Sequence, residues 1–453
     1  MVWVEFAVVL VMIVIGARLG GLGWRHRDGH VLDRRADGSR TVVGGAGTIS
    51  RMLPVPHVPG IPAAQVAAPS APRKVELDWL RLGTIGAVFL FHTGRFFDTM
   101  DWHVKNPVTH AWLGLPELFL IVWGMPLLFV ISGGAVAFSL RGRSVGQYLR
   151  ERVLRVLVPL AVGTFTHVMW QVYLERVSHG QFTGSFLEFV PRYFDGLYGL
   201  GGNFAWMGLH LWYLELLFVF SLVLLPAFLW LGTRGRLILQ RASAFLARPG
   251  VVFLLAVPIA LATILPGPKT LWGATFFGGW NICAHACFFA LGFLLLASDA
   301  TCEAIRRQRL AAALIALGLG LPLAIWFGGA APAAHLSARA LVSLGGMGIV
   351  GWAAVLAILG AGIDRLRGVQ RAYLPRVSEL VLPFYILHQT VILTIGYLVI
   401  RTRMPDLARW ALIAVTSLAV TVALCMLVRS VPALRFLFGM PPRRRRAVQA
   451  AYR

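Results

Sequence analysis

Residues 76–97 form an apolar run that is long enough to cross a bilayer, and three of its ionisable side chains lie inside the run. The three are Asp78, Arg81 and His92. Inserting an ionisable group into hydrocarbon costs a few kcal/mol on insertion scales, so each of them needs a polar partner or a functional role. The stretch therefore predicts a membrane helix that forms one wall of a polar cavity.

The spacing of these three residues places them on one side of the predicted helix. Arg81 and His92 are 11 residues apart, which is within about 20° of three full turns and about 16 Å along the axis. Asp78 precedes Arg81 by three residues, so its carboxylate can reach the guanidinium on the same helix. We expect an ion pair near one end of the helix and an imidazole near the other.

His92 is the leading candidate for chemistry. Burial in a low-dielectric site favours the neutral form of an imidazole. A neutral imidazole can take the proton from a hydroxyl group that attacks a carbonyl carbon, which is general-base catalysis. The alternative is a histidine that only hydrogen-bonds a neighbouring helix for packing.

The composition indicates an integral membrane protein. Of the 453 residues 58% are hydrophobic and 13% are charged, whereas soluble proteins average about 25% charged residues. The net charge of +23 comes from basic residues in short loops between apolar runs, as the positive-inside rule predicts. We therefore expect no nucleic-acid partner.

The cysteines predict neither disulfides nor a metal site. Cys283 and Cys287 share a helix face, but His285 between them points away. A metal site needs more converging ligands than this. We expect free thiols and no bound metal.

The chain divides into three parts. Residues 1–72 combine an apolar anchor, a basic stretch and a Pro-rich linker, at 2–17, 24–40 and 51–72. Residues 73–430 form the predicted membrane domain, and 431–453 form a basic cytoplasmic tail. The fold class expected is an all-α integral membrane protein, a bundle of about ten transmembrane helices with an extra N-terminal apolar segment.

Ten apolar runs define the predicted spans, at 76–97, 113–138, 153–174, 208–231, 250–266, 272–297, 310–328, 338–361, 379–400 and 407–430. Alternate loops are dense in arginine, at 139–152, 232–249, 298–309 and 362–378. The positive-inside rule then places both ends of the domain in the cytoplasm. Arg81 would lie near the cytoplasmic boundary and His92 nearer the outer face.

Arginines at one cytoplasmic rim suggest a site for phosphate, because a guanidinium offers a planar pair of donors. They are Arg141, Arg143, Arg150, Arg152 and Arg155. The alternative is that they only hold the loop inside. Just before them, Ser132, Gly133 and Gly134 predict either a close helix approach or an opened turn.

Two further polar residues lie within apolar runs. Glu215 is a candidate acid, base or orienting group. The alternative is that it pairs with another polar group and serves only the structure. His210 is five residues before Glu215, so the two do not share a helix face closely. His388 lies about mid-span, with Gln389 beside it.

Several sequence blocks together resemble acyltransferase family three. They are Arg81-x10-His92, FVISGG at 129–134, RERVLRVLVP at 150–159, HLWYLELL at 210–217 and LPFYILHQTVI at 382–392. The family consists of ten-helix bacterial membrane enzymes that acylate O-antigen, peptidoglycan, periplasmic glucans and other sugars or lipids. The likeness covers about 73–430 and leaves the first 72 residues unexplained.

The resemblance implies an acyl-CoA co-substrate, most commonly acetyl-CoA, on the cytoplasmic side and no permanently bound cofactor. The acceptor would be a hydroxyl of a sugar, glycan or lipid-linked sugar. The resemblance favours His92 as the catalytic base, with Arg81 on the same face and Asp78 beside it. It also favours Arg150, Arg152 and Arg155, with Arg141 and Arg143 nearby, as ligands of the CoA phosphates.

The sequence therefore predicts an O-acyltransferase in which His92 takes the acceptor proton during attack on the thioester. Direct transfer and a covalent acyl-enzyme both stay open, as do the acyl group, the acceptor and the oligomeric state. The alternative from another class is a proton-coupled transporter with Arg81, His92, Glu215 and His388 as a relay. A sensor or scaffold in envelope assembly is a third possibility.

Overall fold

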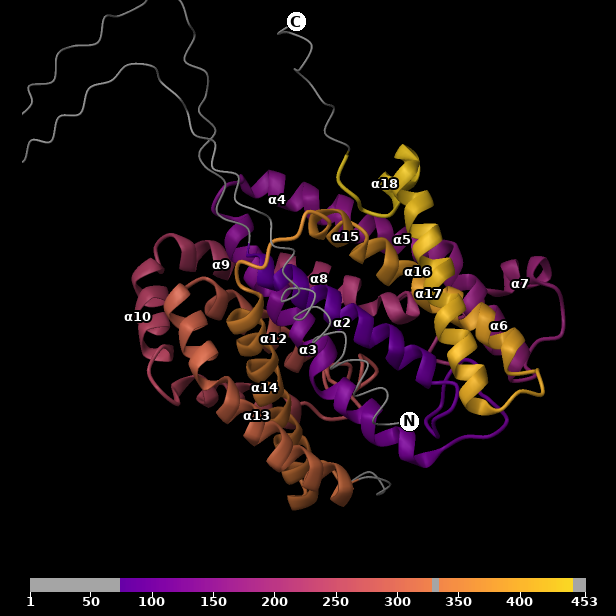
Figure 1. Cartoon of the computed structure of the whole chain (residues 1–453), viewed down its shortest axis with the longest axis horizontal. Coiled ribbons are helices and arrows are strands. Elements are labelled where there is room, and N and C mark those ends of the chain that lie inside the picture. The colour runs from indigo at the N-terminus through magenta and orange to yellow at the C-terminus, as the bar shows by residue number, and fades with distance from the viewer. Residues whose placement is uncertain (1–73, 328–333, 443–453) are drawn as a thin grey trace, which may run out of the picture.

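The computed structural model describes residues 74–327 and 334–442, and this part of the chain is helical without a β-strand (Figure 1). The predicted N-terminal anchor, basic stretch and linker lie outside the described residues, as do residues 443–453 of the predicted basic tail. The protein is a helical membrane protein, as the composition predicts.

The α-helices of the described residues are α2 (Val75–Gly94), α3 (Gly114–Ser139), α4 (Val145–Arg152), α5 (Val158–Phe165), α6 (His167–Ser178), α7 (Phe186–Arg192), α8 (Trp212–Val223), α9 (Leu225–Gly232), α10 (Arg236–Leu246), α11 (Ala256–Ile264), α12 (Ile282–Leu296), α13 (Asp299–Phe327), α14 (Ala338–Leu366), α15 (Leu374–Ser378), α16 (Val381–Val399), α17 (Asp406–Ser430) and α18 (Pro432–Leu437). Four short segments of other helix types join them: η1 (Ala111–Leu113), η2 (Val153–Leu157), η3 (Leu209–Leu211) and η4 (Val251–Leu255).

Each of the ten predicted spans contains at least one helix. Among the described residues, six helical segments are long and apolar enough to cross a membrane, and two bent pairs bring the number to eight. The two remaining predicted spans are α2 and α12. Charged residues near its start lower the hydropathy of α2, and α12 has only 15 residues.

Several predicted boundaries are wrong. The predicted loops at 139–152 and 232–249 contain helices α4 and α10, and two other differences have a clear local cause. The run at 272–297 becomes helical only at Ile282, because Gly278 and Gly279 adopt positive φ angles of 62° and 80° just before it. Such angles suit a turn and not a helix. The arginine-rich segment 298–309 is not a loop but the first part of α13, where Glu303 forms ion pairs with Arg306 at 2.7 Å and Arg307 at 2.9 Å. Pairs at these spacings support a helix.

Helix α2 lies at the centre of the bundle. It packs against α3, α14, α16 and α17, while α13 packs along α14 (Figure 1). A residue on α2 can therefore meet side chains from several helices that are distant in sequence.

Helices α3 and α12 cross closely at two glycines. A Cβ atom on Gly133 would lie 1.8 Å from the carbonyl oxygen of Phe289, and one on Gly292 would lie 2.1 Å from that of Val130. Small residues allow such a backbone approach in a membrane. Of the two predictions for the Ser132–Gly134 segment, close approach is therefore the correct one, because α3 continues as a helix to Ser139.

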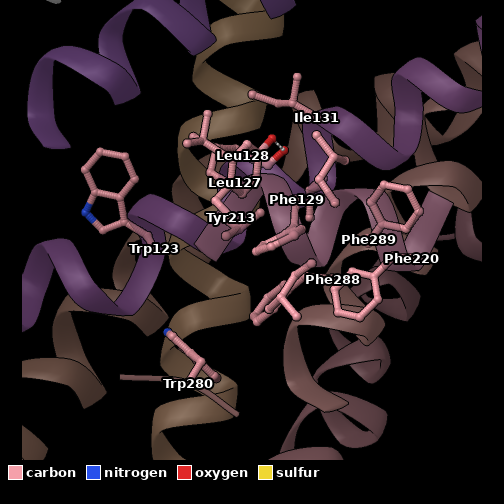
Figure 2. Packing of buried hydrophobic residues seen from close by; sticks show 14 of the residues in the cluster. Trp123, Leu127, Leu128, Phe129, Ile131, Tyr213, Phe220, Trp280, Phe288 and Phe289 are labelled. Atoms are coloured by element: carbon pink, nitrogen blue, oxygen red, sulfur yellow. Dashed lines mark hydrogen bonds between the residues drawn. The ribbon is translucent and has the colours of Figure 1, made fainter. Parts of the chain in front are cut away.

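Aromatic side chains fill the space beside this crossing. Phe129, Phe220 and Phe289 gather between α3, α8 and α12 (Figure 2). The ring centroids of Phe129 and Phe220 are 5.7 Å apart, and those of Phe220 and Phe289 are 6.0 Å apart. Such offset pairs add to the stabilisation from burial, so the core fixes the position of α8 against α3.

Candidate functional site

A cavity of about 70 Å³ lies beside the C-terminal half of α2. We call it the His92 cavity. Its wall is mostly apolar and is formed by Ala87, Val88, Phe91, His92, Leu120, Ile121, Gly124, Met125, His210, Trp212, Gly278 and Tyr385. The space is sufficient for a few water molecules or a small acyl group. A mainly apolar pocket with a few polar side chains is the usual form of a small-molecule site.

The His92 ring is held by neighbouring rings and not by hydrogen bonds. Its centroid is 6.1 Å from that of Trp102, with the planes 15° apart, and 5.3 Å from that of His388. The Nδ1 atom is buried, and it has no hydrogen-bond partner among the described residues. His92 is therefore not a histidine whose ring is fixed by bonds to a neighbouring helix.

The two nearest buried histidines differ from His92 in this respect. The Nδ1–H of His388 is 2.7 Å from the carbonyl oxygen of Tyr385, and the Nε2–H of His210 is 3.0 Å from that of Ile386. The Gln171 amide lies 3.4 Å from the other nitrogen of His210. His388 and His210 are themselves neighbours, with ring centroids 5.4 Å apart.

The N-terminal part of α2 carries the predicted ion pair. Arg81 lies 3.7 Å from Asp78, and both side chains are partly exposed. The charges of Arg81 and Arg152 both act on the hydroxyl of Tyr213. That hydroxyl shares a hydrogen bond of 2.7 Å with Ser132. A hydrogen-bonded pair of hydroxyl groups from α3 and α8 thus lies within electrostatic range of one arginine of α2 and one of α4.

A second tyrosine joins this polar cluster to the His92 cavity. The ring of Tyr385 is 5.7 Å from that of Tyr213 and also lines the cavity. Its hydroxyl donates a hydrogen bond to the backbone oxygen of His210. Polar side chains therefore extend from the arginine-rich end of the bundle to the wall of the cavity.

The predicted phosphate-binding arginines fall into two groups. Arg150 and Arg155 are exposed and have no ion pair with any described residue, and the half-buried Arg152 lies over the ring of Tyr148, 4.9 Å from its centroid. These three stay candidates for a polyanion.

Arg143 and Arg141 are already engaged by the protein. Arg143 forms an ion pair of 2.8 Å with Glu151 and donates to the Ser139 hydroxyl. Arg141 donates to the carbonyl oxygen of Ala297 at 2.9 Å. An arginine that already has a carboxylate partner has fewer free N–H donors for a phosphate group, so Arg143 is the weakest of the five candidates.

A known protein family matches most of the chain. The sequence model of the family described as "Acyltransferase domain" matches residues 74–429, which is most of the chain. The chain belongs to the acyltransferase-3 family. This confirms the resemblance drawn from the sequence blocks, and the matched region contains every predicted site residue.

Curated relatives of this acyltransferase-family chain carry the name "Glucans biosynthesis protein C". The protein of Salmonella paratyphi A is 27% identical over 188 residues, which is 41% of this chain and 47% of that protein. The protein of Salmonella schwarzengrund is 27% identical over 197 residues, 43% of this chain and 49% of that protein. The chain thus spans about half the length of the curated relatives it matches. No solved structure matches it.

Glu215 lies on α8, whereas the other predicted catalytic residues lie on α2. It is half-buried and does not line the His92 cavity, and its Oε2 atom is buried without a hydrogen-bond partner among the described residues. His285 is a core residue, with its ring 4.6 Å from Phe129. No group of three or more His, Cys, Asp or Glu residues within 74–327 and 334–442 could hold a metal ion.

The loop that carries Trp102 is fixed by buried charges. Asp98 is fully buried and pairs with Arg95 and with Lys105, the latter at 2.6 Å. Arg95 also reaches Glu117 at 3.3 Å. Burial lowers the pKa of Lys105, and the carboxylate of Asp98 opposes the shift. This network holds Trp102 over the imidazole of His92.

Sequence reasoning missed Trp102, Tyr213 and Tyr385 as parts of the site and did not connect His210 with His92. The available signal was weak. Two histidines within apolar runs, at 210 and 388, called for partners, but nothing in the spacing indicated that they meet each other.

Proposed function

We propose that this protein is a membrane O-acyltransferase that moves an acyl group, in the first instance acetyl, from acyl-CoA to a hydroxyl of a glycan. His92 is the general base, and Arg81 lies on the same helix face nearer the donor. The CoA phosphates bind to the arginines of α4 and η2, namely Arg150, Arg152 and Arg155. The acyltransferase-3 family membership supports the reaction class.

The observation that carries this proposal is the position of one imidazole. His92 faces a small cavity, neither of its ring nitrogens has a hydrogen-bond partner within the described residues, and Arg81 lies about 16 Å away on the same helix. A general base must offer an unoccupied lone pair to the proton that it abstracts. Among the cavity-lining residues, His92 meets that requirement best.

The reaction balances without a cofactor. The acceptor O–H proton moves to a ring nitrogen of His92 while the oxygen attacks the carbonyl carbon of the thioester. The C–S bond breaks, and the CoA sulfur takes the proton back from the His92 imidazolium. The products are the O-acyl ester and the free CoA thiol, and His92 returns to its neutral form.

The polar cluster at Tyr213 supports entry of the donor from the arginine-rich side. Guanidinium groups suit the phosphates of CoA. The hydroxyls of Ser132 and Tyr213 could then bond the amides of the pantetheine arm, which would bring the thioester past Tyr385 to His92. By the positive-inside rule this side is cytoplasmic, and the bacterial enzymes that the sequence blocks resemble imply the inner membrane.

The name of the relatives suggests the acceptor class. They are called glucans biosynthesis proteins, so we propose a glucan hydroxyl as the first acceptor to test. It would reach His92 from the side of the bundle that carries Trp102.

The test is transfer of label from radiolabelled acetyl-CoA to a glucan by the purified full-length protein. Loss of the base predicts that His92→Ala lowers the rate by about two to four orders of magnitude while acetyl-CoA still binds. No acetyl-CoA binding by the wild type would overturn the proposal. An unchanged rate in the variant would discard His92 as the base but retain the reaction.

The same preparation tests the transporter alternative. Vesicles that contain the protein would accumulate a labelled substrate without acyl-CoA if His92, Arg81, Glu215 and His388 formed a proton relay. We expect no such uptake.

A further inference from the structure

Two neighbouring imidazoles each have one buried ring nitrogen without a partner. These atoms are Nδ1 of His92 and Nε2 of His388, and neither has a hydrogen bond to any described residue. The two ring centroids are 5.3 Å apart, with the planes at 48°. At this separation, a small ring rotation or one bridging water could join the two nitrogens.

The hydrogen bond of His388 to its own helix decides which of its nitrogens can accept. Its Nδ1 lies 2.7 Å from the carbonyl oxygen of Tyr385, and a carbonyl oxygen can only accept. The proton of a neutral His388 is therefore on Nδ1, and the lone pair is on Nε2. The unpartnered nitrogen of His388 is thus an acceptor.

An acceptor at this position needs a donor, and the buried Nδ1 of His92 can supply one. If Nδ1 of His92 carries the proton, Nε2 of His92 has the lone pair that a general base uses. A second residue that fixes the tautomer and orientation of the catalytic imidazole, and stabilises the imidazolium, is a recurring catalytic arrangement. In many sites that residue is a carboxylate, but no carboxylate lines the described wall of the His92 cavity.

We propose that His388 is the positioning residue for His92, and this rests on the proposed function of His92. The Nε2 of His388 accepts the Nδ1–H of His92, directly or through one water. It thereby directs the Nε2 lone pair of His92 at the acceptor hydroxyl and shares the positive charge when His92 is protonated. The proton itself stays on His92 until the CoA sulfur takes it.

His210 does not fill this role. Its Nε2–H donates to the backbone of Ile386, and its Nδ1 faces the Gln171 amide, so both nitrogens are engaged. Its ring centroid lies 5.4 Å from that of His388, so it packs against the His388 ring.

Two substitutions of His388 distinguish the roles of its two ring nitrogens. In His388→Asn the side-chain amide can still donate to the Tyr385 oxygen, but no acceptor reaches the position of Nε2. In His388→Gln the longer side chain can place its amide oxygen near that position. We expect His388→Asn to lower kcat about 10- to 100-fold with an unchanged KM for acetyl-CoA, which is the usual effect of losing a supporting residue. His388→Gln should recover part of that loss.

The decisive readout is the double variant. If His388 acts only through His92, adding His388→Asn to His92→Ala should change the residual rate less than about twofold, because residues that act as a unit are not additive. A merely structural role would lower the rate by the same factor in both backgrounds. Multiplying losses would therefore overturn the inference.

His285→Asn is the matched control. His285 is also fully buried, its Nε2–H donates to the carbonyl oxygen of Phe277 at 2.8 Å, and its Nδ1 has no partner among the described residues. It does not line the cavity. We expect loss of stability in this variant, but no tenfold fall in kcat per mole of protein that binds acetyl-CoA.

The outcomes distinguish this inference from the proposed function. If His92→Ala has no effect, the assignment of the base fails. If His92→Ala abolishes transfer while His388→Asn leaves kcat unchanged, only the role of His388 is wrong.

Discussion

The close crossing of α3 and α12 offers a sharp test of how the bundle holds its site. Adding one methyl group at Gly133 would place a carbon atom 1.8 Å from the backbone oxygen of Phe289. Ordinary contact begins near 3.4 Å, so one helix would have to move by about 1.6 Å. The obstacle is backbone and not a side chain, so no change of rotamer can relieve it.

We therefore expect Gly133→Ala to destabilise the protein by about 3 kcal/mol, the upper part of the range for overpacked cores. The same holds for Gly292→Ala, which meets the backbone oxygen of Val130 at 2.1 Å. Because one separation of the helices relieves both clashes, the double variant should cost clearly less than the two single losses combined. The measurement is the free energy of unfolding from an SDS titration in mixed micelles.

Gly318→Ala is the control, because it makes the same change in a membrane helix where no heavy atom lies within 4 Å. Alanine is the better helix former, so this variant should be neutral or more stable by about 0.5–1 kcal/mol. If Gly133→Ala is as stable as the control, the helices do not cross as closely as described. If the double variant shows fully additive losses, the two glycines do not share one crossing.

Four further substitutions test the assignment of the remaining site residues. Arg152→Ala should raise the KM for acetyl-CoA about tenfold or more. Arg143→Ala removes a guanidinium that is already paired with a carboxylate, so it should change this KM less than about threefold. Equal effects of the two variants would contradict the division of the arginines into free and engaged ones. Glu215→Gln should leave kcat within about threefold of wild type, because Glu215 does not line the cavity, and a loss of two orders of magnitude would make it part of the catalytic machinery. Trp102→Ala removes the ring beside His92 and should lower kcat about tenfold with acetyl-CoA binding retained; an unchanged kcat would show that this ring does not position the base.

The arrangement of residues within a single helix could be predicted from the sequence alone. The Asp78–Arg81 pair and the shared face of Arg81 and His92 follow from 3.6 residues per turn, and the structure has α2 continuous from Val75 to Gly94 with the ion pair formed. Hydropathy likewise located a helix in each of the ten predicted spans. Local periodicity determines these features, so they need no knowledge of neighbouring helices.

Tertiary structure decided which side chains surround His92. His388, His210 and Trp102 come from α16, η3 and a loop, and only the packing of these segments around α2 brings them together. A membrane helix buries an apolar face against lipid as readily as against another helix, so hydropathy does not encode which helices meet. For the same reason the sequence could nominate an arginine cluster but not that Arg143 is already paired with Glu151. The periodicity of one helix fixed the two ends of the candidate site, and the packing of the other helices determined the surroundings of its imidazole.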